Sequence, residues 1–270
     1  MSLRRTDKHF YLLDNEDPVP GITSIIGVLD KPALVAWAAE QAGRGAVEYG
    51  DMIAAHVGHE TTEMTCPICT SGKPWHKTAD DRLGSWLRGL PYAKRDAAGN
   101  AGTAVHAIAE AIAKGETPDV TKYEDFTRAF MVDFVEKYHP TFHSLYVEAM
   151  VYHAGDDGTI LPYGGTMDLF CRIGDETWLI DHKTTKSGVY PETALQLAGG
   201  RFAQFIGLPD DPKRYPIPKV DRCGVLWIRP EGAELIPYDV TPREFQAFAA
   251  ARMAWDWVNH RAKEVKGAAA

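Results

Sequence analysis

The sequence has no long apolar run. Its 270 residues are 45% hydrophobic, yet no stretch approaches the roughly 20 consecutive apolar residues that a transmembrane helix needs. The opening residues, MSLRRTDKHF, also lack the apolar core of a secretory signal peptide. We therefore expect a soluble protein that works in the cytoplasm and has no membrane partner.

Cysteine and basic side chains are scarce as well. Four cysteines in a chain without an export signal indicate a reducing compartment, where disulfides are rare. Lysine and arginine together number 29 against 37 aspartate and glutamate residues, and the formal net charge is −8. That charge argues against a protein that binds DNA nonspecifically over its whole surface, but it permits a local basic channel beside an acidic, metal-filled site.

The apolar pattern that is present predicts a chain of mixed helices and strands. Helices are expected at 31–50, 102–115, 123–139, 191–207 and from 242 onward, and strands at 145–153, 164–174, 176–185, 223–230 and 233–240. We divide the chain into an N-terminal hairpin and helix (1–51), a polar insertion (52–87), a core with a C-terminal helix (88–262) and a disordered tail (263–270).

One buried strand ends in charge. The apolar residues WLI at 178–180 run directly into Asp181, His182 and Lys183, with no turn residue between them. Because side chains alternate along a strand, Asp181 and Lys183 share one face and His182 points away from it. A solvated strand end with a surface ion pair is the structural alternative.

The preceding predicted strand carries Asp168, and the short turn GDE at 174–176 would bring it near Asp181. Two neighbouring carboxylates repel unless a proton or a cation lies between them. A divalent ion with oxygen ligands removes that repulsion, and Lys183 could then orient the attacking water or stabilise an oxyanion. The pattern indicates a metal and phosphate site, although Asp168 alone is also typical of a turn.

Further motifs stand in the same order, and together they resemble the PD-(D/E)XK nuclease superfamily. Asp168 followed on the next strand by Asp181-x-Lys183 matches its signature, and GTAVHAIAE is similar to its helical Gly-Thr-x-x-His motif, which contains His106 here. The helix ALQLAGGRFAQF, with Gln196, resembles the glutamine helix of RecB-like members. The chain is most similar to the CRISPR-associated-type exonucleases of actinobacterial phages, from about residue 19 to residue 230 except across the polar segment.

The resemblance implies a central mixed sheet flanked by helices, in an α/β (α+β) nuclease core, and an enzyme that hydrolyses DNA phosphodiester bonds as an exonuclease. The implied ligands of one Mg²⁺ or Mn²⁺ are His106, Asp168, Asp181 and the backbone carbonyl of His182. Lys183 would position the nucleophile, Gln196 would support it, and Glu148 would bind a second ion or a water. An imidazole ligand favours a transition metal, so we expect Mn²⁺ to support activity at least as well as Mg²⁺.

Three functions stay open on these residues. An exonuclease is the first, a structure-specific or sequence-specific endonuclease of the same fold is the second, and a non-catalytic nucleic-acid-binding adaptor is the third. DNA is the expected partner, with a recombinase or single-strand-binding protein as a possible second one. His106 could also be a packed helix residue, and Glu148 a cross-strand partner for a lysine.

Two features depart from the family pattern. RecB-like helices read Gln-x-x-x-Tyr, whereas Gly200 stands in the place of the tyrosine. The spacing of the four cysteines, Cys66, Cys69, Cys171 and Cys223, does not match that of an iron–sulfur cluster in these relatives. We therefore expect no such cluster.

The polar segment carries a motif of its own, Cys66-Pro-Ile-Cys69. A two-residue gap forms a compact turn that can aim both thiolates at one ion, and two imidazoles from His56, His59 and His76 would complete a tetrahedral structural zinc site. Free thiols or a redox pair are the alternatives. Because the segment has few aliphatic residues, a metal would supply the stability that its core lacks.

Overall fold

The computed structural model describes residues 3–14, 17–29, 31–57, 59, 65–71, 78–118, 142–156, 158–185, 188–208, 211–229 and 231–265. The chain forms two compact units: residues 1–29 with 102–270, here called the sheet unit, and residues 30–101, here called the helical unit. These boundaries differ from the predicted ones, because helices on both sides of the polar segment group with it. The predicted helix at 123–139 and His76 lie outside the described residues.

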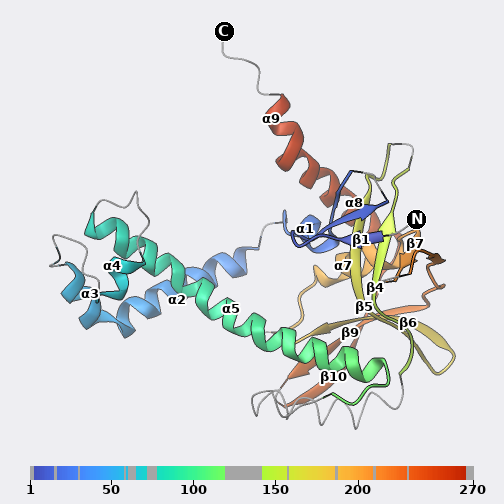
Figure 1. Cartoon of the computed structure of the whole chain (residues 1–270), viewed down its shortest axis with the longest axis horizontal. Coiled ribbons are helices and arrows are strands. Elements are labelled where there is room, and N and C mark those ends of the chain that lie inside the picture. The colour runs from blue at the N-terminus through green and yellow to red at the C-terminus, as the bar shows by residue number, and fades with distance from the viewer. Residues whose placement is uncertain are drawn as a thin grey trace. The chain divides into compact units, whose positions relative to one another are not determined.

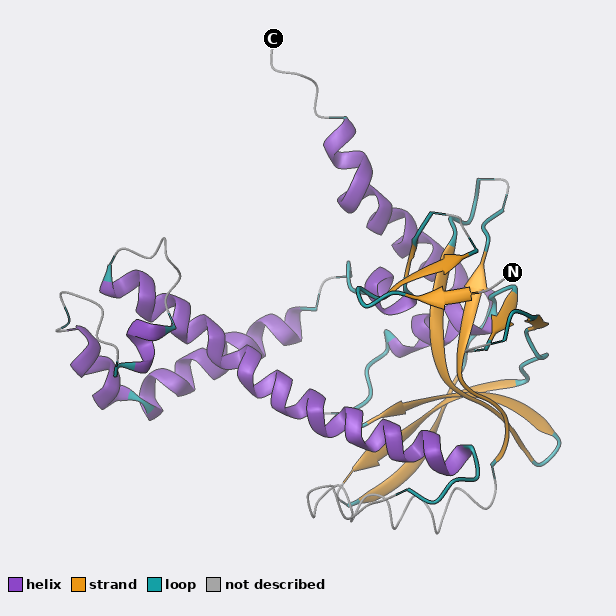
Figure 2. Cartoon of the chain, in the orientation of Figure 1, coloured by secondary structure: helices purple, strands orange, loops and turns teal. Residues whose placement is uncertain are grey.

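The sheet unit is built on a seven-stranded mixed sheet (Figures 1 and 2). In spatial order its strands are β10 (Gly232–Tyr238), β9 (Arg222–Arg229), β6 (Glu176–Lys183), β5 (Tyr163–Ile173), β4 (His143–His153), β7 (Phe205–Gly207) and β8 (Arg214–Pro216). The β6–β9 pair is parallel, and every other neighbouring pair is antiparallel. The five predicted strands are confirmed, and so is a mixed sheet flanked by helices.

The predicted helix at 191–207 is too long. Helix α7 (Thr193–Arg201) ends early, and Phe205–Gly207 instead forms β7, which pairs with β4 on one side and β8 on the other. The edge of β4 would otherwise leave a row of backbone donors and acceptors unpaired, and β7 satisfies them. Tertiary pairing therefore overrides the local apolar pattern here.

Helices α1 (Ile22–Ile26), α7 and α8 (Pro242–Asp256) cover one face of the sheet. Their apolar residues pack with Met167, Phe170 and Leu179 in the main core. Helix α8 begins at Pro242, as predicted. Thr241, the N-cap residue, forms a capping box with Glu244 in the first turn of the helix.

The other face of the sheet is covered by residues 102–113 of helix α5 (Ala79–Ala113). Val105, Ile108 and Ile112 pack there against a second cluster that includes Leu169 and Ile180. Successive residues of β6 thus enter different cores, as strand alternation requires. The described helix around His106 confirms the helical setting predicted for this motif.

A small sheet of β1 (Leu3–Arg5), β2 (Phe10–Leu13) and β3 (Val19–Pro20) packs on the large one. The contact depends on Gly164, where a Cβ would lie 2.4 Å from Cβ of Tyr11. A side chain at this position would push the small sheet away, so glycine permits the close approach.

The helical unit contains α2 (Pro32–Glu48), α3 (Gly50–Val57), α4 (Pro67–Thr70) and the first part of α5. Its described apolar cluster is small: Cys66, Ile68 and Cys69 are buried, and Met52, Ile53, Leu83 and Trp86 pack against them.

Within the described part of the chain, no helix has both the length and the apolar character required to cross a bilayer. The predicted disordered tail begins too early, since Ala262–Glu264 forms a short helix, α9; residues 266–270 lie outside the described part.

Candidate metal centres

The first site lies where the β4–β5 ladder is distorted. Val147 pairs with Leu169 and Ala149 pairs with Met167, so Glu148 and Asp168 lie opposite each other between these pairs. Glu148 has a φ of 49°, in the left-handed region that a non-glycine residue rarely adopts. Backbone strain of this kind costs about 1–3 kcal/mol and is typical of functional sites.

Three side chains from separate elements meet beside this distortion. His106 from α5, Asp168 from β5 and His182 from β6 place one ligand atom each within 4.8 Å of one another. His106 Nδ1 lies 3.8 Å from Asp168 Oδ2, and that oxygen accepts a 2.6 Å hydrogen bond from the backbone N–H of His182. Two imidazoles and a carboxylate are a donor set suited to a divalent transition metal.

The glycine of the Gly-Thr-x-x-His motif has a packing role. A Cβ on Gly102 would lie 2.9 Å from Thr184 Oγ1, just beyond the end of β6. Its absence lets α5 approach the end of β6, which brings His106 within reach of His182.

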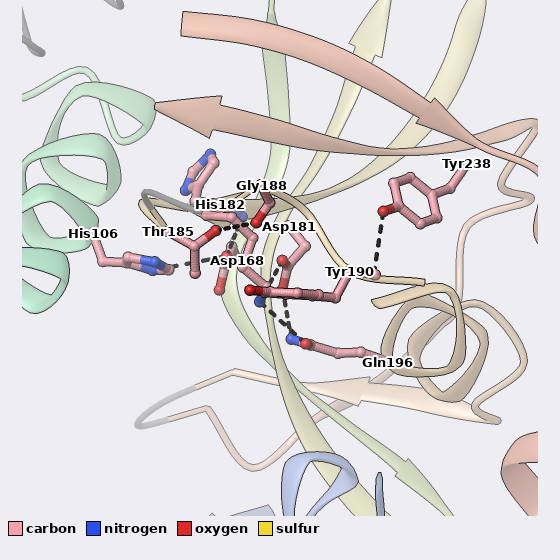
Figure 3. Close-up of polar contacts among 10 residues, drawn as sticks. His106, Asp168, Asp181, His182, Thr185, Gly188, Tyr190, Gln196 and Tyr238 are labelled. Carbon is pink, nitrogen blue, oxygen red and sulfur yellow. Dashed lines mark hydrogen bonds and ion pairs between the residues drawn. The ribbon is translucent and has the colours of Figure 1, made fainter. Parts of the chain in front are cut away.

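On the opposite face of β6, Asp181, Lys183 and Gln196 form a closed triangle (Figure 3). Gln196 Nε2 donates to Asp181 Oδ1 at 2.5 Å, Lys183 Nζ lies 2.6 Å from Asp181 Oδ2, and the same Nζ donates to Gln196 Oε1 at 3.2 Å. Asp181 is 1% exposed, whereas the Lys183 side chain retains 27% exposure. The triangle therefore anchors an amine that still reaches solvent.

The pKa values of two acidic residues at this site are raised, because these residues are buried near other carboxylates. Burial, together with the nearby charges of Asp168 and Glu110, raises the pKa of Glu148 to about 7. Burial likewise raises the pKa of Asp181, although Lys183 opposes this and Asp168 reinforces it. A cation placed among these carboxylates would reduce their mutual repulsion.

The imidazole of His182 is buried beside His106 and Asp168. Burial, aided by the charge of His106, lowers the pKa of His182 to about 3, so the ring is neutral at physiological pH, as metal ligation requires. Its side chain points away from Asp181 and Lys183, as predicted, but this direction leads to His106 and Asp168. The sequence predicted its backbone carbonyl as a metal ligand, and the structure also brings its imidazole to His106 and Asp168.

The loop after β6 is held by contacts that the sequence analysis missed. Trp227 Nε1 donates to the carbonyl of Thr185 at 2.7 Å, and Tyr238 Oη donates to the carbonyl of Tyr190 at 3.2 Å (Figure 3). Both aromatic residues come from the neighbouring strands β9 and β10. No local motif marks them, because their role depends on strand order.

The second centre lies in the helical unit, where His56, His59, Cys66 and Cys69 place one ligand atom each within 4.8 Å of one another. His56 Nδ1 lies 3.7 Å from Cys66 Sγ and 3.5 Å from Cys69 Sγ, and His59 Nδ1 lies 3.4 Å from Cys69 Sγ. In a tetrahedral site, zinc bonds of about 2.3 Å to sulfur and 2.0–2.1 Å to nitrogen imply a separation of about 3.5 Å between such atoms. The group can therefore hold a metal such as zinc.

The surroundings favour the thiolate form of Cys66 at this centre. Although burial raises the pKa of Cys66, hydrogen bonds from the Cys69 backbone and from His56 lower it to about 6. Nε2 of His56 lies 3.0 Å from the carbonyl oxygen of Ala79, which directs Nδ1 toward the sulfur atoms. Of the three candidate histidines, His56 and His59 are brought to the cysteines. Cys171 and Cys223 lie elsewhere, in the two apolar clusters of the sheet.

Comparison of the sequence with models of known protein families finds no match, and comparison with curated proteins finds none either. The functional assignment therefore rests on the residues and geometry of the two centres.

Proposed function

We propose that the protein is a metal-dependent deoxyribonuclease that hydrolyses phosphodiester bonds, and that it acts as an exonuclease. The observation that carries the proposal is the arrangement around β6. One face of this strand presents His182 to His106 and Asp168, and the other presents the Asp181–Lys183–Gln196 triangle. A protein that only binds nucleic acid gains nothing from two acids and an amine held together beside a strained strand.

The residues fit a divalent cation. The side chains of His106, Asp168 and His182 would hold it, with Glu148 available across the strand pair. Asp181, which the sequence predicted as a further ligand, instead binds Lys183 and Gln196 on the other face of β6. A bound ion of this kind lowers the pKa of a coordinated water and offsets charge on the attacked phosphate. The two imidazoles favour Mn²⁺ over Mg²⁺, which prefers oxygen ligands.

The chain's own groups supply position and charge. Lys183 is fixed by Asp181 and Gln196, so its ammonium can orient a water molecule and stabilise negative charge on the phosphoryl oxygens. Gln196 binds both Asp181 and Lys183 through its side-chain amide. Its loss would allow Lys183 to adopt other rotamers. Gln196 therefore acts through Lys183 as a positioning residue.

We further propose that the second centre holds a structural zinc ion. Two thiolates and two imidazoles complete four-coordinate zinc and leave no open position for a substrate. The small apolar cluster of the helical unit supports this role, because few other side chains among its described residues are buried and able to stabilise it.

Digestion of end-labelled linear DNA and covalently closed circular DNA tests the nuclease. We expect wild type to degrade linear DNA with Mn²⁺ and with Mg²⁺, and to leave circles intact. EDTA and Lys183→Ala should each abolish the reaction. Cutting of circles would indicate an endonuclease instead, and absence of cleavage with both metals would exclude catalysis. Strict dependence on Mg²⁺ with inert Mn²⁺ would contradict ligation by His106 and His182.

A further inference from the structure

A basic strand lies against the sheet near the first centre. On β1, Leu3 and Arg5 share a face, and Leu3 is buried in a cluster with Met150 and Tyr152 of β4. Arg5 continues this face but is exposed. Its cross-strand partner is Tyr11, so the two side chains lie next to each other on the same side of the hairpin.

Tyr11 fixes where this face is placed. Its hydroxyl lies 2.8 Å from Thr166 Oγ1, and its ring packs directly on the backbone of Gly164. Thr166 precedes Asp168 by two residues on β5. Arg5 therefore lies beside a residue that is anchored to the strand that carries Asp168.

The turn of the hairpin adds an imidazole next to Arg5. His9 has a φ of 59°, a left-handed conformation that is strained for histidine, and its Nδ1 contacts an Nη atom of Arg5. Within the described part of the chain, no carboxylate lies at ion-pair distance from Arg5. Arg4, on the opposite face, instead donates to the carbonyl of Asp14 at 3.3 Å.

We propose that Arg5 and His9 form a phosphate-binding subsite that holds a nucleic acid strand beside the first metal centre. The inference rests on the proposed nuclease function and names a contact for its substrate. The phosphates of a nucleic acid strand are repelled by the carboxylates of Asp168, Glu148 and Asp181. The guanidinium of Arg5, which the imidazole of His9 contacts, offsets this repulsion. Arginine suits this task because its planar donors fit a phosphate in two-bond geometry.

The electrostatics agree with this placement. Burial and Asp168 raise the pKa of Glu148, whereas the positive charge of Arg5 acts in the opposite direction. Arg5 is thus close enough to act on the first centre, although it forms no ion pair with Glu148.

The test uses the full-length protein and a fluorescent DNA oligonucleotide. Binding is measured by anisotropy without added Mn²⁺ or Mg²⁺, where cleavage does not interfere, over a series of KCl concentrations. Cleavage kinetics are measured separately with Mn²⁺. The variants are Arg5→Ala, Arg5→Lys and His9→Asn, and Arg4→Ala is the control because it removes the same charge from the other face of the hairpin. Thermal melting verifies that each variant is folded.

We expect Arg5→Ala to weaken DNA binding about tenfold and to reduce the slope of log affinity against log salt by about one. KM should rise in parallel, with kcat within about twofold of wild type, and Arg5→Lys should keep most of the salt dependence. Equal losses with 5′-phosphorylated and 5′-hydroxyl DNA would place an internal phosphodiester in the subsite, and a loss confined to phosphorylated ends would place the terminal phosphate there.

Other outcomes overturn the inference. Equal effects of Arg5→Ala and Arg4→Ala would mean that only net charge matters. A fall in kcat and in Mn²⁺ affinity with unchanged DNA binding would make Arg5 a counter-charge for Glu148. The nuclease proposal fails separately: wild type that binds DNA through Arg5 but cleaves none would refute catalysis and leave the subsite standing.

Discussion

The sharpest prediction concerns Cys69→Ser. Cys69 Sγ lies near both imidazoles of the second centre, 3.5 Å from His56 Nδ1 and 3.4 Å from His59 Nδ1, so its loss removes a thiolate from the middle of the ligand set. Structural zinc contributes about 10–16 kcal/mol to the folding of small zinc modules. This is comparable to or larger than the roughly 5–15 kcal/mol that stabilises a whole domain. The helical unit should therefore unfold without the metal.

The assay has two readouts. Zinc content, measured with a colorimetric chelator after denaturation, should fall from one ion per chain to none in the variant. About half of the helical residues that the structure describes lie in residues 30–101. The circular dichroism signal at 222 nm should accordingly fall by up to about half, while the thermal transition of the sheet unit persists.

Cys171→Ala is the matched control, because Cys171 is fully buried in the sheet and far from the ligand set in sequence. It should lower the transition temperature of the sheet unit and leave zinc content at one ion per chain. The reasoning would be refuted if wild type purified without chelators carried no zinc. It would also be refuted if a strong chelator left the helical signal unchanged.

Three further predictions follow from contacts in the sheet unit. Gly164→Ala should cost about 1–3 kcal/mol in denaturant unfolding, because its Cβ would overlap Tyr11, and it should weaken DNA binding as the hairpin shifts. His182→Ala should abolish the rise in melting temperature produced by Mn²⁺, whereas Lys183→Ala should preserve it. The opposite result would show that the proposed ligand assignment is wrong. Because the folded-state pKa of Glu148 is raised to about 7, metal-free stability should fall as pH rises from about 5 through 7. The stabilisation by Mn²⁺ should be larger at pH 8 than at pH 6, and Glu148→Gln should flatten this difference.

Much of the fold around the site could be predicted from local patterns. The apolar residues that follow Asp168 and those that precede Asp181 mark central strands, and the Gly-Thr-x-x-His segment marks a helix. β7 could not be predicted, since Phe205–Gly207 follows an apolar helix without a turn signal. Only the exposed edge of β4, a feature of the assembled sheet, decides that these residues form a strand.

The site was predictable in composition but not in detail. Alternation along β6 places His182 on the face opposite Lys183. Only the position of α5 in the folded chain shows that His106 lies next to His182 on that face. The left-handed conformation of Glu148 has no local signal either, because its apolar neighbours are typical of a regular strand. Only the assembled sheet places this strained residue opposite Asp168.

The two faces of β6 are joined at Asp168. The β5–β6 ladder ends at the Leu169–Ile180 pair, and the same register continued would set Asp168 opposite Asp181 and Met167 opposite His182. Instead, the carboxylate of Asp168 accepts the backbone N–H of His182 at 2.6 Å, in the place where a strand carbonyl would otherwise be expected. The strands can part without leaving this donor unsatisfied. Asp168 thereby remains close to the histidine pair on one face while its charge still acts on Asp181 on the other, so a single side chain links the candidate metal ligands His106 and His182 to the Asp181–Lys183 pair.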